Sequence, residues 1–168
     1  WIFKSFGLAD LDEEPLCKIS DALALQKDLD VPLPVVLSFW GDMSTRSYKK
    51  NTALYEQLFL TKAISQLSTE FAAVAQSDGN AASTTPILQL AVGVMLGLRI
   101  QLDELAMLMV DNVSETAMHL PALLSSGAFI TMPNLSRLHR VVAFARAIRM
   151  STREYLVLRE LSGMNVLE

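Results

Sequence analysis

The chain contains little of the chemistry that catalysis or metal binding needs. Its 168 residues include one cysteine, Cys17, and two histidines, His119 and His139. One cysteine cannot form an intramolecular disulfide, so a disulfide framework is excluded. Neither histidine has a cysteine, an aspartate or a second histidine at ligand spacing, which argues against a metal site. We expect both histidines to be surface or packing residues, and Cys17 to be an inert, partly buried thiol.

Sequence signatures of common enzyme classes are also missing. There is no G-x-S-x-G nucleophile motif, no Walker loop and no G-x-G-x-x-G dinucleotide fingerprint. The neighbouring carboxylates Asp12–Glu14 and Asp103–Glu104 can be read as acid–base pairs or as a calcium site. Because nothing resembles a calcium-binding loop, we interpret them as first-turn acids that favour a helix N-terminus. The sequence therefore predicts no catalytic, cofactor-binding or metal-binding residue, and no cofactor.

No stretch of the chain is suited to crossing a bilayer or to binding nucleic acid. The longest apolar run, 87–100, is interrupted by Gln89 and Arg99 and is shorter than the roughly 20 residues that span a membrane. The net charge is −4, and no basic stripe with interleaved aromatic residues occurs, which argues against a nucleic-acid partner. The chain begins with Trp1 and shows no signal peptide, so we interpret it as a fragment of a longer chain.

What the sequence does have is apolar side chains and an uneven distribution of charge. Hydrophobic residues make up 51% and the mean hydropathy is +0.32, so either the core is large or some apolar surface is meant for neighbours. Residues 1–30 carry seven acidic side chains against three lysines, whereas residues 131–168 carry six arginines against three glutamates. Such arginines can meet phosphate but more often pair with acidic segments. The eight methionines are interpreted as core filler rather than as a binding groove.

Pro133–Gly163 is predicted to fold as a helix, a tight turn and a second helix. Thr131 can cap the first helix, with a proline in its first turn. Ser151 and Glu154 form a capping box that starts the second helix, and Gly163 offers a C-terminal stop. Apolar residues of the first helix follow the three- and four-residue steps of one helix face: Leu135, Leu138, Val141, Val142, Ala145 and Ile148.

The same pattern predicts the packing of this unit. A second side of the first helix carries the small residues Ser136, Ala143 and Ala147. This side either lets another helix approach closely or simply consists of good helix formers. Eight side chains of the chain are expected in the core: Val36, Phe39, Trp40, Phe59, Leu138, Val142, Leu158 and Leu161.

The helix-turn-helix unit is repeated upstream. Gly97–Leu105 aligns with Ala147–Tyr155, so that Arg99 falls on Arg149 and Glu104 on Glu154; upstream of this stretch, Leu88 falls on Leu138. A more degenerate copy lies earlier in the chain, where four apolar residues take the places of Leu98, Ile100, Leu102 and Leu105: Leu29, Val31, Leu33 and Val36. The sequence therefore predicts several helix pairs built on one pattern.

The remaining segments are predicted mainly from capping, proline and apolar signals. They are a helix from Pro15 through Gln26, a helix over Val35–Trp40, a polar loop over Gly41–Asn51, and a helix capped by Asn51 or Thr52 with Leu54, Tyr55, Leu58 and Phe59 on its apolar face. A flexible loop follows at about 68–86, with a helical turn at 71–75, then helices over 87–96, 102–110 and 116–124 and an extended connector over 128–132. We expect one helical domain over 1–168, all-α, a multi-helix bundle of repeated helix-turn-helix units.

Three stretches carry a more specific signal. They are Leu37–Asp42 (LSFWGD), Leu54–Leu60 (LYEQLFL) and Asn134–Arg140 (NLSRLHR), the last leading on to Leu161–Gly163. In order and separation they resemble the helical region of the A component of bacterial Tc (insecticidal) toxin complexes, and of the related virulence-plasmid A proteins of enterobacteria. The resemblance covers most of residues 16–165, with Thr61 where the family commonly has asparagine.

The resemblance implies a function that the residues alone do not give. A components of this family form large five-fold assemblies that dock on target cells, insert a channel and pass a toxic enzyme carried by partner subunits. Their helical domain belongs to the shell that surrounds the channel before insertion. By this resemblance the chain is a non-catalytic shell segment of a secreted toxin complex. Its partners are other domains of the same chain, further copies in a pentamer and the partner subunits, and it meets membranes only through other parts of the full-length chain.

Two other interpretations remain open from the sequence. The first is a stand-alone helical adaptor protein of the plasmid-virulence A type, which predicts a defined binary partner. The second is an enzyme built on a helical bundle, which requires carboxylates or histidines that converge in a pocket.

Overall fold

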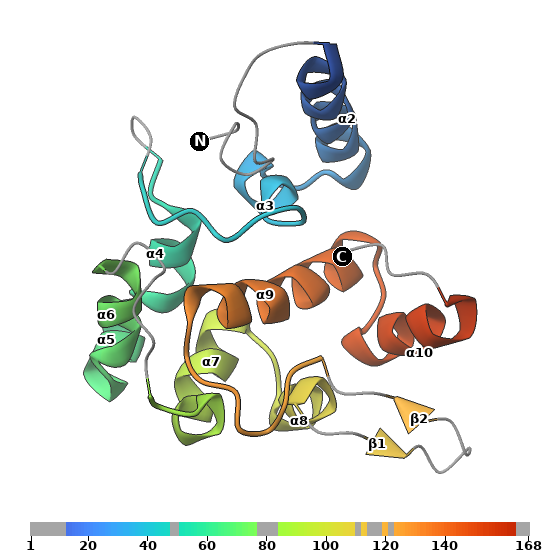
Figure 1. The fold of residues 1–168 in the computed structure, drawn as a ribbon. Coiled ribbons are helices and arrows are strands. Elements are labelled where there is room, and N and C mark those ends of the chain that lie inside the picture. The colour runs from blue at the N-terminus through green and yellow to red at the C-terminus, as the bar shows by residue number, and fades with distance from the viewer. Residues whose placement is uncertain are drawn as a thin grey trace.

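Helix α9, Met132–Ala147, crosses the middle of the molecule, and the other helices are arranged around it (Figure 1). The computed structural model describes residues 13–47, 51–76, 84–109, 112–113, 119–120 and 123–163. Within these ranges the fold is all-α, as predicted. No helix in the described part of the chain is both long enough and apolar enough to span a membrane.

The described elements follow one another as short helices joined by tight turns. Before α9 come α2 (Glu13–Leu29), α3 (Leu33–Leu37), α4 (Leu54–Phe59), α5 (Lys62–Leu67), α6 (Glu70–Gln76), the 3-10 helix η1 (Ile87–Leu90), α7 (Ala91–Leu98), α8 (Leu102–Met109) and two short strands, β1 (Asn112–Val113) and β2 (His119–Leu120). Helix α10 (Thr152–Ser162) follows α9.

The helix pair α9–α10 forms with the caps that the sequence predicts. The Thr131 hydroxyl accepts a hydrogen bond from the Asn134 amide at 3.3 Å. At the start of α10, the Ser151 hydroxyl accepts the Glu154 amide at 3.2 Å while the Glu154 carboxylate accepts the Ser151 amide at 2.8 Å. Gly163 then ends α10 with a left-handed φ of 62°, a conformation that glycine adopts without steric cost.

Three helix pairs turn through the same backbone conformation. The non-glycine residues with positive φ in the described chain are Asp30 (51°), Arg99 (55°) and Arg149 (60°), and the predicted repeat places them at one equivalent position. In each turn the next amide donates to the carbonyl five residues back, as in a Schellman motif: Val31 to Gln26 at 3.4 Å, Ile100 to Met95 at 3.0 Å and Met150 to Ala145 at 2.9 Å. The repeat is therefore structural as well as sequential.

Two of the copies also share a hydrogen bond in which a glutamate accepts the amide of the second residue after the left-handed position. Glu154 accepts the Ser151 amide, and its counterpart Glu104 accepts the Gln101 amide at 3.1 Å. In the first copy this position is Pro32, which has no amide hydrogen, and the glutamate is replaced by Val35. The first copy therefore lacks both the amide donor and the glutamate acceptor of this hydrogen bond.

Two of the helix pairs are joined at their turns. The Arg146 guanidinium of α9 donates to the carbonyl oxygens of Leu98 at 2.8 Å and Arg99 at 2.6 Å, at the end of α7. A cation near the C-terminus of a helix satisfies free carbonyls and opposes the helix dipole. The Thr152 hydroxyl of α10 donates to the Glu104 carboxylate of α8 at 2.8 Å. The α7–α8 and α9–α10 hairpins consequently lie side by side.

Two glycines of α7 allow aromatic rings of α4 and α6 to pack directly against the helix backbone. A Cβ added at Gly93 would lie 2.6 Å from Phe71, and one added at Gly97 would lie 2.5 Å from Phe59. The two rings are stacked, with centroids 5.5 Å apart, and both are buried. The Tyr55 hydroxyl donates to the Phe71 carbonyl at 3.0 Å, and burial raises the pKa of Tyr55. The apolar face predicted for α4 thus packs on α7.

The core predictions are confirmed at five positions and wrong at three. The buried side chains are Val36, Phe39, Phe59, Leu138 and Val142. Leu158 and Leu161 are 46% and 67% exposed, because α10 packs through the first-turn side of Tyr155 and Leu156 and its last turn passes beyond its neighbours. Trp40 is 47% exposed, because α3 ends at residue 37 and the following turn directs Phe39, not Trp40, toward α9.

The N-terminal hairpin α2–α3 forms a small second cluster above the main body (Figure 1). Its buried members are Ala22, Val36 and Leu37. Cys17 is exposed, so the expectation of a partly buried thiol is wrong, since α2 packs through a narrow face centred on Ala22. The predicted helix over 35–40 is shorter and starts earlier, at Leu33, since Pro32 supplies the extended N-cap.

The polar loop after α3 caps α4 in place of the residues that the sequence indicates. The Ser44 hydroxyl accepts a hydrogen bond from the Leu54 amide at 3.2 Å, and the Ser47 hydroxyl accepts one from the Ala53 amide at 3.2 Å. Asn51 and Thr52 therefore do not cap α4, whose N-cap residue is Ala53. These acceptors lie six and ten residues upstream in the loop, and Glu56 of α4 also accepts a hydrogen bond from the Ala53 amide at 3.4 Å.

Two further segments differ from prediction. The helical turn predicted at 71–75 is confirmed as part of α6, which is longer than expected within the predicted loop and buries Phe71 and Val74; 77–83 lie outside the described residues. His119–Leu120 is a strand paired antiparallel with β1, so the helix predicted over 116–124 is wrong there; 116–118 and 121–122 lie outside the described part. The pairing comes from a segment earlier in the chain, which helical spacing cannot anticipate. The extended connector is confirmed by a bridge between Pro86 and Phe129.

Candidate functional site

The most polar buried contact in the described chain joins the segment after α3 to α9. The Arg140 guanidinium donates to the carbonyls of Ser38 at 3.1 Å and Gly41 at 3.2 Å. One turn earlier, the Ser136 hydroxyl accepts the Met43 amide at 3.0 Å. Ser136, predicted on the small-residue side of the helix, thus allows a close approach, though of an extended segment rather than of a helix.

Ser38 and His139 form the pair in this contact that most resembles catalytic chemistry. The Ser38 Oγ lies 3.3 Å from His139 Nδ1, and it also donates to the Val35 carbonyl at 2.6 Å. A hydroxyl has one hydrogen, and the shorter contact uses it. The hydrogen between Ser38 and His139 therefore belongs to Nδ1, and the imidazole donates to the serine. A histidine in this tautomer cannot remove the serine proton through Nδ1, as a nucleophile's base would.

The electrostatic surroundings of His139 keep its ring neutral. Burial, reinforced by the positive charges of Arg146 and Arg140, lowers the pKa of His139 from 6.5 to about 4. A catalytic triad instead places a carboxylate beside the imidazole to stabilise its charged form. Ser38 is 1% exposed and His139 is 6% exposed, so a substrate has no access to the pair. The arrangement joins two packed segments and lacks the carboxylate and the access of a catalytic serine–histidine pair.

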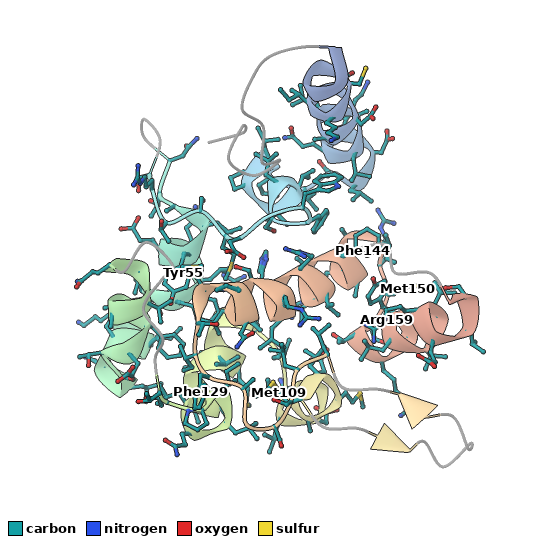
Figure 2. The ribbon with its side chains drawn as sticks, in the orientation of Figure 1. Tyr55, Met109, Phe129, Phe144, Met150 and Arg159 are labelled. Carbon is teal, nitrogen blue, oxygen red and sulfur yellow. The ribbon has the colours of Figure 1, made fainter. Side chains whose placement is uncertain are left out.

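An aromatic column continues from this contact toward α10. Phe39 meets Phe144 edge-on with centroids 5.5 Å apart, and Phe144 meets Tyr155 at 5.5 Å. Phe144 and Met150 lie where α9 ends, with Arg159 of α10 close by (Figure 2). The Tyr155 hydroxyl is buried without a hydrogen-bond partner among the described residues, and burial raises its pKa. The helical spacing of the sequence did not single out Phe144 or Tyr155, because each meets its partner through tertiary packing.

Of the acidic residues considered in the sequence, the structure describes the pair on α8 and the backbone positions of Glu13 and Glu14 in α2. Asp103 and Glu104 lie in the first turn of α8, and Glu13 begins α2, in agreement with their interpretation as first-turn acids. Asp12 lies outside the described residues. Among the residues that the structure describes, no group of three or more histidine, cysteine, aspartate or glutamate side chains could hold a metal ion. His139 is the packing residue expected, whereas for His119 only its place in β2 is described.

Exposed apolar side chains are numerous for so small a chain. Three of them, at four-residue steps along η1 and α7, form one outward ridge: Leu88 (40%), Val92 (58%) and Leu96 (50%). Their repeat counterparts Leu138 and Val142 on α9 are buried. Equivalent sequence positions therefore face the core in one copy and solvent in the other. Part of the chain's high apolar content consequently lies on the surface.

Comparison of the chain with protein-family models, curated proteins and solved structures gave no match.

Proposed function

We propose that the chain is a structural segment in the helical shell of a pore-forming toxin translocation component, which delivers a toxic enzyme into target cells. In this role it performs no catalysis and binds no cofactor. Its partners are other domains of the same toxin chain, further copies of itself and the partner subunits of a secreted complex. The proposal starts from the resemblance of three sequence stretches to Tc toxin A components and virulence-plasmid A proteins.

One observation carries the proposal furthest. The first and third of these stretches contact each other through Ser38, Gly41, His139 and Arg140. The second stretch forms α4, whose Phe59 packs against Gly97. These residues of the three stretches therefore contribute to the packing of one helical scaffold, as expected of a wall and not of a reaction site.

The coding sequence on either side of this chain provides the decisive test. A long reading frame that continues into a channel-forming region supports the proposal. A short frame close to this size contradicts it, and a defined binary partner in pull-downs then favours the adaptor interpretation. An enzyme is tested separately with Ser38→Ala and His139→Asn, which should lower stability without removing any hydrolytic activity that the chain displays.

A further inference from the structure

Charge divides the three hairpins into two kinds. At the equivalent left-handed position, the α7–α8 and α9–α10 hairpins carry Arg99 and Arg149, whereas the α2–α3 hairpin carries Asp30. All three side chains are exposed. The structure therefore presents like turns of opposite charge on different parts of its surface.

The two arginine-bearing turns act as one surface, which we call the basic turns: Arg99, Arg146, Arg149 and Arg153. They are held together because Arg146 donates to the Leu98 and Arg99 carbonyls. Two carboxylates of this region are hydrogen-bonded, since Glu104 accepts hydrogen bonds from the Gln101 amide and the Thr152 hydroxyl, and Glu154 accepts from Ser151. A third, Asp103, is exposed in the first turn of α8. Leu102, at the start of α8 beside these turns, is 63% exposed.

The α2–α3 hairpin, here called the acidic hairpin, has no sister hairpin stacked on it in the described chain. The other two hairpins are bonded to each other through Arg146 and Thr152. The acidic hairpin leaves Leu23 48% exposed and the adjoining Trp40 47% exposed. Asp21, Asp28 and Asp30 are exposed on it. Repeated helical units characteristically bury such faces by stacking on a neighbour.

We propose that the acidic hairpin of one copy docks on the basic turns of a second copy. The excess charges of the two surfaces are opposite, although Lys18 and Lys27 are also exposed on the acidic hairpin and Asp103 is exposed beside the basic turns. Opposite excess charge favours encounter and fixes orientation. The exposed Leu23 and Trp40 on one side and Leu102 on the other supply apolar area. Two different surfaces meet, so the contact is heterologous and propagates head to tail into a ring or a filament. The inference rests on the proposed function, because a shell built from several copies needs a contact between neighbouring copies.

Sedimentation velocity of the purified chain over a range of concentrations tests the contact. In low salt we expect species heavier than the 18.5 kDa monomer. In about 1 M salt, where the Debye length is about 3 Å, association should weaken strongly because exposed charges are screened. A chain that stays monomeric at all concentrations in low salt would overturn the inference.

Reciprocal charge reversal identifies the surfaces. The repeat itself supplies conformationally matched substitutions, since aspartate and arginine both occur at the left-handed position. Asp28→Arg/Asp30→Arg makes both surfaces basic, and Arg99→Asp/Arg149→Asp makes both acidic. Each variant alone should associate at least about tenfold more weakly. An equimolar mixture of the two should regain association, because every contact again pairs opposite charges.

Two controls complete the test. Lys62→Glu reverses an exposed charge on α5, away from both surfaces, and should leave association unchanged; circular dichroism confirms that all variants are folded. Association that survives both reversals, or a mixture that does not regain it, contradicts the inference. Such a result leaves the proposed function standing, because the reading frame decides that question independently.

Discussion

Arg149 has the same left-handed backbone conformation as Arg99, with φ values of 60° and 55°. In both turns, the next amide reaches back to a carbonyl five residues earlier, Ala145 in one and Met95 in the other. Two arginines fifty residues apart thus occupy the same left-handed position of equivalent helix-ending turns. A side chain with a Cβ pays about 1–2 kcal/mol in this conformation relative to the right-handed one.

Substitution at Arg149 measures that strain. Arg149→Gly should leave the free energy of unfolding unchanged or raise it by up to about 1 kcal/mol, because glycine removes the steric cost while gaining freedom in the unfolded chain. Arg149→Val should lower it by about 1–2 kcal/mol, because a β-branched side chain disfavours positive φ. Urea denaturation compares the two variants. Equal stabilities would argue against the left-handed turn.

Gly97 should not tolerate a methyl group. In Gly97→Ala the new Cβ would lie 2.5 Å from Phe59, whose ring is stacked on Phe71 and fully buried. We expect a loss of about 1–3 kcal/mol from overpacking, even though alanine favours helix by about 1 kcal/mol. Gly127→Ala is the matched control, since nothing lies within 4 Å of its added Cβ, and its midpoint in urea should be unchanged.

His139 should make the folded state less stable in acid. Its pKa falls from 6.5 to about 4 on folding, so between these values the unfolded chain binds more protons and stability decreases as pH falls. The full loss, about 3 kcal/mol, is reached below pH about 4. His139→Asn keeps a hydrogen-bond donor for Ser38 and removes the titration. Unfolding free energies measured at a series of pH values should therefore vary less in this variant over that window, and an unchanged pH dependence would exclude His139 as its source.

Leu138 and Leu158 should differ sharply although both belong to the predicted core. Leu138 is fully buried, and Leu138→Ala should cost about 2–5 kcal/mol through lost burial and a cavity. Leu158 is 46% exposed, and Leu158→Ala should cost less than about 1 kcal/mol because water already reaches half of the side chain. Thermal unfolding followed by circular dichroism distinguishes them. Similar losses would mean that α10 packs differently from the structure.

The repeated turn is the feature that sequence reasoning reached most fully. Alignment of Arg99 with Arg149 and of Glu104 with Glu154 predicted equivalent helix pairs, and the structure gives both pairs the same turn and the same glutamate-to-amide bond. These interactions span only a few residues, so local spacing contains them. The Ser38–His139 contact was not predicted, because its partners are about a hundred residues apart and local spacing does not show that their two stretches meet.

By itself the sequence determined the helix pair α9–α10 and its caps at Thr131 and Ser151, because capping hydrogen bonds and apolar periodicity act between near neighbours. Tertiary structure alone decided which apolar face meets the core. Leu88 and Leu138 are equivalent in the repeat, yet the first is 40% exposed and the second is buried. Burial depends on what covers a helix, and segments distant in the chain provide that cover.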